Sequence, residues 1–264
     1  ADGETITNNY DDVTVDTTVS GIGFDIYGRQ LGSSTISRRH GVEGAKVLDV
    51  TTTTVKTVAL SDYNRLSQLT GYEETITNGP DSAGNYYDDI RVINTVSEIG
   101  YDEFGRQLGR VTESRRMADA DRNGIADVDA AGNKVLDVTT ITVKTVVTGN
   151  YNILGQVVEY EEEVRNDYDN VVVTNRVSGI GFDIRGRQLG STTVSERIGS
   201  RYYQTVGGVE VEIGLGAYVS LSAEEQGLVR TVIELNTETT TVKTVDSAAY
   251  NRLGQVEAYG ETIT

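Results

Sequence analysis

The sequence predicts an all-β protein in which tandem long antiparallel β-hairpins form a continuous, elongated repeat sheet. The chain of 264 residues has no Trp and only 3 Phe, and it is rich in Thr, Val, Gly and Tyr, which favours strands over a helical globule. A turn-like motif also occurs three times. The segments between its copies alternate apolar and polar residues, which is the period of a half-buried strand.

The repeated motif is an aromatic residue followed by Asp-x-x-Gly-Arg-Gln-Leu-Gly. It forms the last nine residues of each of the segments 23–32, 100–109 and 181–190. Asp opens a turn by hydrogen-bonding nearby backbone, and Gly three residues later takes the left-handed conformation that other residues resist. Each copy therefore predicts a hairpin with a type I turn and a G1-type bulge. Its structural residues are Phe24, Asp25, Gly28, Tyr101, Asp102, Gly105, Phe182, Asp183 and Gly186.

A shorter variant alternates with this motif, at residues 63–68, 151–156 and 250–255. It begins Tyr-Asn and ends in Gln, so Asn and Gln stand where the longer motif has Asp and Arg. Ser67 occupies the glycine position of one copy. That turn is therefore expected to be strained or differently shaped.

Two long hairpins, or four strands, are expected in each repeat. We place the repeats at residues 4–74, 75–163 and 164–260, and residues 261–264 start a further unit because Glu-Thr-Ile-Thr at residues 4–7 recurs there. A reversal of the apolar phase at residues 21–23 predicts a bulge. Residues 40–46 are expected to form a loop.

Insertions account for the length differences between the repeats. The second repeat carries residues 117–133 between its hairpins, and the third carries residues 199–227. Within the latter, residues 209–213 alternate like an extra strand, and residues 222–226 predict one capped helical turn.

The aromatic-Asp-x-x-Gly-Arg motif followed by a β run resembles the YD (RHS) repeats of large secreted and cell-surface bacterial proteins. That resemblance implies hairpins in a long continuous sheet and an extracellular or surface location. Two features differ from the family: the repeats here are far longer, and half of the turns use Asn with Gln. The toxin-encapsulating shell of some members is not carried over.

Residues 119–129 carry the sharpest chemical signal, Asp-x-Asp-x-Asn-Gly-x-x-Asp. Oxygen ligands at alternate positions with Gly at the sixth suit Ca²⁺, which takes six or more oxygens at flexible distances. The spacing resembles the loops of EF-hand, dockerin and thrombospondin type 3 modules, although Ala130 replaces the bidentate Glu. The alternative is a solvated acidic turn. The candidate ligands are Asp119, Asp121, Asn123, the carbonyl of Ile125, Asp127 and Asp129.

Three further sets of residues recur between repeats, and each has a structural and a functional interpretation. Acidic residues before the first strands suit either a shared cation or solvated edge charges. The motif arginines suit either an anionic ligand or pairing with the motif Asp or an aromatic face, and the short-turn tyrosines suit either a sugar-binding strip or a core ladder. These sets are Asp11, Asp12, Asp88, Asp89, Asp167 and Asp169; Arg29, Arg106 and Arg187; and Tyr63, Tyr151 and Tyr250.

Charge and composition limit the function. The net charge of −17 argues against nucleic acid and anionic membrane as partners, and no apolar run is long enough for a membrane span. Catalysis has little support, because His40 is the only His and there is no Cys.

The sequence therefore predicts a non-enzymatic extracellular structural protein, such as a filament, stalk or adhesin shaft. Its expected partners are further copies of itself or neighbouring repeats, joined through strand pairing at the ends. The first alternative is a glycan- or partner-binding module presented by the insertions. The second is a polysaccharide-processing enzyme that uses paired carboxylates.

Overall fold

The computed structural model describes residues 2–8, 13–43, 46–79, 90–121, 123–130, 132, 134–166, 170–206, 208–214, 217–218, 221–251 and 254–264. The strand order follows the sequence from β1 to β11 and continues with β13 and β14, while β12 pairs with β11. This confirms the predicted all-β class: consecutive hairpins form one continuous antiparallel sheet. The chain divides into two compact parts, residues 1–99 with 112–139 and residues 100–111 with 140–264.

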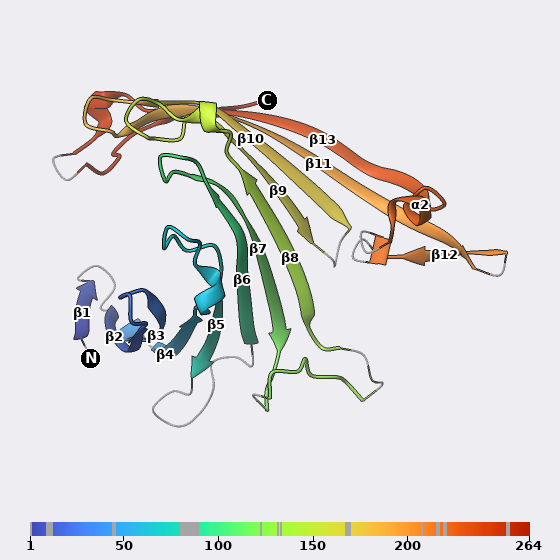
Figure 1. Cartoon of the computed structure of the whole chain (residues 1–264), viewed down its shortest axis with the longest axis horizontal. Coiled ribbons are helices and arrows are strands. Elements are labelled where there is room, and N and C mark those ends of the chain that lie inside the picture. The colour runs from blue at the N-terminus through green and yellow to red at the C-terminus, as the bar shows by residue number, and fades with distance from the viewer. Residues whose placement is uncertain are drawn as a thin grey trace. The chain divides into compact units, whose positions relative to one another are not determined.

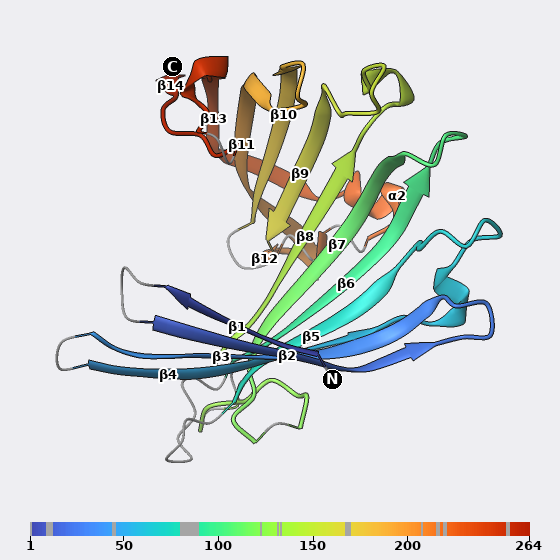
Figure 2. The same cartoon turned by 90° about the vertical axis from the view of Figure 1, so that its left-hand side faces the viewer.

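The strands of the first half of the chain are long and regular. In Figure 2, β1 to β5 lie side by side in sequence order. The bounds are β1 (Asp2–Asn8), β2 (Val13–Phe24), β3 (Gln30–Glu43), β4 (Lys46–Thr57), β5 (Tyr72–Gly79), β6 (Ile90–Tyr101) and β7 (Gln107–Ala118).

The strands of the second half continue the same antiparallel sheet, and Figure 1 shows β9, β10, β11 and β13 side by side. The strands are β8 (Asp137–Thr145), β9 (Tyr160–Asn166), β10 (Val171–Phe182), β11 (Gln188–Val206), β12 (Val209–Ile213), β13 (Arg230–Thr244) and β14 (Gly260–Ile263). Counted from β2, four strands recur in each period of the chain: β2 to β5, β6 to β9, and β10, β11, β13 and β14. Strands β5, β9 and β14 cross the repeat bounds predicted at residues 74, 163 and 260.

The bulge predicted at residues 21–23, near the end of β2, is confirmed, and β10 has an unpredicted bulge at the equivalent place. The β2–β3 register shifts between Ser20 and Gly23, and Gly21 has φ 62°. The β10–β11 register shifts at the equivalent place, where Gly179 has φ 61°. In the second repeat Glu98 occupies this position with φ 54°, a conformation that is costly for a residue with a Cβ.

The elements of the third-repeat insertion are confirmed as well. The predicted extra strand is β12, paired with the end of β11. The predicted helical turn is α2 (Ala223–Gln226), where the Ser222 Oγ accepts from the Glu225 amide at 3.4 Å and the Glu225 carboxylate accepts from the Ser222 amide at 2.9 Å. These reciprocal bonds form a capping box.

Two local predictions are incorrect or incomplete. The loop expected at residues 40–46 is instead strand at both ends, because β3 continues to Glu43 and β4 starts at Lys46, with Gly41 paired to Leu48. A glycine weakens a strand but does not end one while the partner ladder continues. The sequence analysis also missed three 3₁₀ turns that follow the third strand of each repeat: η1 (Leu60–Asp62), η2 (Thr148–Asn150) and η3 (Ser247–Ala249).

The hydrophobic core is small. Among the described residues only ten apolar side chains are buried, and they include the equivalent residues Val58, Val146 and Val245, each 5% exposed. A core of this size leaves much of the stabilisation to backbone ladders and to polar contacts between neighbouring strands.

Candidate functional sites

The long turns have the predicted backbone geometry. In the first copy the Asp25 amide donates to the Arg29 carbonyl at 3.0 Å, and the Gly28 amide donates to the Asp25 carbonyl at 3.1 Å. Gly28 has φ 77°, and Gly105 and Gly186 both have φ 78°. A type I turn followed by a left-handed glycine defines the G1-bulge hairpin, and the same pair of bonds closes the other two copies.

The motif aspartate holds each long turn together. Oδ1 of Asp25 accepts from the amides of Tyr27 and Arg29 at 2.8 and 2.9 Å, and Oδ2 accepts from the Arg29 Nε at 2.6 Å. Desolvation raises the pKa of Asp25, but the bonds from Arg29 and Tyr27 outweigh it and hold the pKa below its ordinary value. The pKa values of Asp102 and Asp183 are lowered in the same way. The carboxylate is thus part of the turn.

The short turns replace this charged pair with a neutral pair of the same shape. Asn64 Oδ1 accepts from the amides of Leu66 and Gln68 at 2.9 and 3.0 Å, while its Nδ2 donates to the Gln68 Oε1 at 2.7 Å. Asn with Gln is therefore the uncharged equivalent of Asp with Arg. Ser67 adopts φ 61°, so this turn keeps the common shape and the predicted strain lies in the Ser67 backbone.

Each motif arginine stacks on the tyrosine of the following short turn. Ring-centroid distances are 4.9 Å from Arg29 to Tyr63, 4.5 Å from Arg106 to Tyr151 and 4.4 Å from Arg187 to Tyr250. The structural interpretation of the arginines is thus correct, because each is engaged by both the motif Asp and an aromatic face.

The same tyrosines also bind the backbone of the neighbouring hairpin. The Tyr63 hydroxyl donates to the Gln30 carbonyl at 2.6 Å, and Tyr151 and Tyr250 donate to the carbonyls of Gln107 and Gln188. These residues are half-buried at the turns. The expected core ladder is therefore wrong: the tyrosines are clamps between hairpins.

Sequence reasoning missed a second cation–aromatic ladder. The Nζ of Lys56 lies 3.8 Å from the Tyr72 ring, and Lys144 lies 3.8 Å from Tyr160. Lys243 and Tyr259 repeat the contact at 4.5 Å. The constant separation of 16 residues in all three copies is the signal that could have revealed it.

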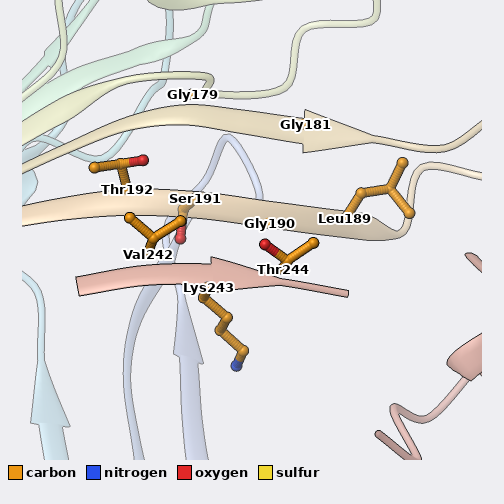
Figure 3. Close-up of a pocket in the computed structure, with 9 residues that line it drawn as sticks. All are labelled: Gly179, Gly181, Leu189, Gly190, Ser191, Thr192, Val242, Lys243 and Thr244. Atoms are coloured by element: carbon orange, nitrogen blue, oxygen red, sulfur yellow. The ribbon is translucent and has the colours of Figure 1, made fainter. Parts of the chain in front are cut away.

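The last glycine of the long motif is required by close approach between strands. A Cβ at Gly32, Gly109 or Gly190 would lie 2.6, 2.4 or 2.5 Å from a Lys carbonyl oxygen on the next strand. Figure 3 shows Gly190 on β11 beside Gly179 and Gly181 on β10, where the missing side chains leave an open hollow of about 290 Å³. Lys243 points away from the other labelled side chains. The hollow is therefore a consequence of strand packing.

The acidic loop, residues 119–129, follows β7 and is anchored by its first carboxylate. Asp119 is fully buried, and its Oδ2 lies 3.0 Å from Nη1 of Arg91 on β6. Both Asp119 oxygens accept from the Gly124 amide at 3.2 Å, and Gly124 has φ 83°. This is the sharp turn that the calcium-loop pattern requires.

The other candidate ligands make contacts within the loop. Asp121 Oδ2 accepts from the Asn123 Nδ2 at 2.8 Å, Asp127 Oδ2 accepts from the Ala120 amide at 2.8 Å, and Ile125 is 67% exposed. Asp129 is exposed. Within the described ranges no three His, Asp or Glu side chains lie close enough to share a metal ion. The donor chemistry and the turn fit Ca²⁺, but the Arg91 guanidinium already supplies the positive charge beside Asp119.

The remaining acidic candidates, Asp11, Asp12, Asp88, Asp89, Asp167 and Asp169, lie outside the described residues. His40 is described, and its Nε2 lies 2.9 Å from Asp16 Oδ2 on the neighbouring strand. It is half-buried within β3.

The third-repeat insertion forms a polar hollow of about 380 Å³ beside β11 and β13. Arg201 faces it with its Nε 2.9 Å from Glu234 and its Nη1 3.8 Å from Glu212. Nearby, the rings of Tyr202 and Tyr218 stack with centroids 4.1 Å apart. Tyr202 is buried in this pair and Tyr218 is half-buried.

No protein-family model, no curated protein and no solved structure matches the chain. The resemblance to YD repeats therefore stays a prediction. None of the helices in the described segments has the length and apolar character needed to cross a membrane.

Proposed function

We propose that the chain is a non-enzymatic extracellular structural protein that forms a filament, stalk or adhesin shaft. The observation that carries this proposal is the equal distribution of one set of contacts over three repeats: the Asp–Arg turn, the Arg–Tyr stack and the Tyr hydroxyl bond. A catalytic site gathers unlike polar groups in one place. This chain instead repeats the same mechanical contacts.

The junctions between repeats support the same role. Strand β5 of the first repeat pairs with β6 with Thr75 opposite Ile93, and β9 pairs with β10 with Glu163 opposite Thr174, which is the equivalent register. Each repeat thus extends the sheet of the previous one by the same step, as in repeat proteins whose units contact only their neighbours. Further copies or repeats are the natural partners. The extracellular location rests on the resemblance to YD repeats.

Electron microscopy of the purified chain tests this proposal. Uniform filaments, or rods that lengthen as repeats are added, are the expected result. Compact monodisperse particles whose length does not change with repeat number would refute a structural role.

A binding module is the second candidate, favoured by the polar hollow of the third-repeat insertion. A glycan array with the chain and its Arg201→Ala and Tyr218→Ala variants tests it. If the chain binds an arrayed glycan and both substitutions abolish this binding without changing the circular dichroism spectrum, glycan binding at the insertion is supported. If neither substitution changes glycan binding, the insertion is not the binding site.

We also propose that Ca²⁺ stabilises the acidic loop, as a counter-charge to Asp119 in addition to or in place of Arg91. The support is the spacing of oxygen ligands and the left-handed Gly124. Calcium should raise the midpoint of thermal unfolding, and EGTA should reverse the rise. If Asp121→Ala unfolds at the same temperature as the unmodified chain with calcium and with EGTA, the loop is not a calcium site.

A further inference from the structure

The last strand of the chain is placed as an internal strand of the repeat array. Lys243 on β13 pairs with Glu261 on β14, as Lys56 pairs with Glu74 and Lys144 with Glu162. The Lys243–Tyr259 stack repeats the two internal Lys–Tyr stacks. Strand β14 is therefore the counterpart of β5 and β9, each of which carries a further strand on its outer edge.

The internal junctions show what that outer edge binds. The amide of Ile99 donates to the Thr70 carbonyl and that of Ile180 to the Val158 carbonyl, both at 3.1 Å. The counterpart of these two acceptors is the carbonyl of Glu257. Its own amide donates to the Ala249 carbonyl at 2.7 Å, just as Thr70 and Val158 donate to Asp62 and Asn150 at 2.6 and 2.8 Å. The backbone before β14 is thus arranged like the two internal junctions.

Burial identifies the complementary surface on the first repeat. At the junction of the first and second repeats Val96 is 5% and Ile99 is 9% exposed, whereas Ile22, the first-repeat counterpart of Ile99, is 49% exposed. On the other side, Tyr259 and Ile263 are 57% and 64% exposed. Each surface exposes apolar groups of the kind that the internal junctions cover.

Strand β1 occupies only part of this surface. It pairs with β2 with Thr5 opposite Asp16, the same register in which Thr75 pairs with Ile93. Its first pair is Asp2 with Val19, so Asp2 stands where β5 has Tyr72, and Ile22 lies beyond the last pair. Strand β1 therefore lies on β2 in the register that β5 has on β6, but its pairs do not reach Ile22.

Resting on the proposed structural role, we propose that β14 binds the β2 edge of a second copy of this chain and replaces β1 there. The internal register places Thr262 opposite Asp16, Ile263 opposite Val15 and Tyr259 opposite Val19. The Ile22 amide then donates to the Glu257 carbonyl of the other copy, as at both internal junctions. Addition of a strand to an exposed edge supplies affinity through backbone bonds and specificity through alternate side chains.

Disulfide trapping tests this register, because the chain has no Cys. A variant with Asp16→Cys and Thr262→Cys is oxidised, and intermolecular disulfides are identified by mass spectrometry. The matched control, Thr18→Cys with Thr262→Cys, places the sulfur two residues away on the same face of β2. A second control, Thr75→Cys with Ile93→Cys, places the same pair inside one chain.

The disulfide between residues 16 and 262 of two chains should be at least about tenfold more abundant than the one between residues 18 and 262. This ratio corresponds to a preference of about 1.4 kcal/mol for the predicted register. Deletion of residues 2–8 should increase the 16–262 link further, because β1 no longer competes. The proposal is overturned if the 75–93 link closes while the 16–262 link is no more abundant than the 18–262 link. Filaments that persist in that case would leave the structural role intact, whereas compact monomers without rods or filaments would refute both.

Discussion

Substitution of Gly109 by Ala is the sharpest test of how neighbouring strands pack in this sheet. A Cβ at residue 109 would lie 2.4 Å from the Lys144 carbonyl oxygen and 3.5 Å from Thr145 Cα. Backbone atoms cannot rotate away as a side chain can. Strands β7 and β8 must therefore separate locally, at the point where the Val146 amide donates to the Leu108 carbonyl.

The expected cost follows from three contributions. Weakening one backbone hydrogen bond costs about 1 kcal/mol, and forcing an extra carbon into a packed contact costs about 1–3 kcal/mol. Replacing Gly by Ala restores about 0.5–1 kcal/mol through the smaller entropy of the unfolded chain. The net expectation is a loss of about 2 kcal/mol in the free energy of unfolding.

Urea denaturation followed by circular dichroism measures this loss. Gly149→Ala is the matched control, because a Cβ there meets nothing within 4 Å and its φ is not left-handed. Gly32→Ala and Gly190→Ala should behave like Gly109→Ala, since their contacts are 2.6 and 2.5 Å. If Gly109→Ala is as stable as Gly149→Ala, the close-approach explanation is wrong.

Three further predictions follow from the turns and ion pairs. Ser67→Gly and Glu98→Gly should each raise the free energy of unfolding by about 0.5 kcal/mol, since relief of the left-handed strain exceeds the entropy cost of Gly; a loss of stability in both variants would contradict this. Tyr63→Phe should lower stability by about 1 kcal/mol through loss of the bond to the Gln30 carbonyl, whereas the exposed Tyr27→Phe should not, and equal effects would argue against the clamp. Hydrogen bonds from Arg115, opposed by desolvation and aided by Lys134, lower the pKa of Asp137 to about 2. Because this pKa lies below the unfolded value of 3.8, the stabilisation is complete above pH 3.8 and is lost as pH falls through about 2. Asp137→Asn should not show this loss of stability in an acid titration. Identical acid profiles of the variant and the unmodified chain would refute the prediction.

Local chemistry explains why the sequence predicts the strands and turns well. The Asp25 carboxylate and the left-handed Gly28 act within five residues of each other, so their spacing alone specifies the turn. Alternation of apolar and polar residues likewise specifies a strand. The prediction of a loop at residues 40–46 failed because Gly41 pairs with Leu48 on β4 and also with Val13 on β2. The pairing with Val13 joins segments that are far apart in the sequence.

The sequence by itself determined the all-β class, the three repeats, the turn type, the bulge and the extra strand and helical turn of the third-repeat insertion. Only the tertiary structure showed that the Tyr63 hydroxyl bonds to a neighbouring hairpin and that Asp119 pairs with Arg91. It also showed that residue 109 must be glycine because a carbonyl oxygen of the next strand leaves no room for a Cβ. The physical reason is that these contacts join different strands. Which side chains meet there depends on register, and register is set by the pairing of whole strands.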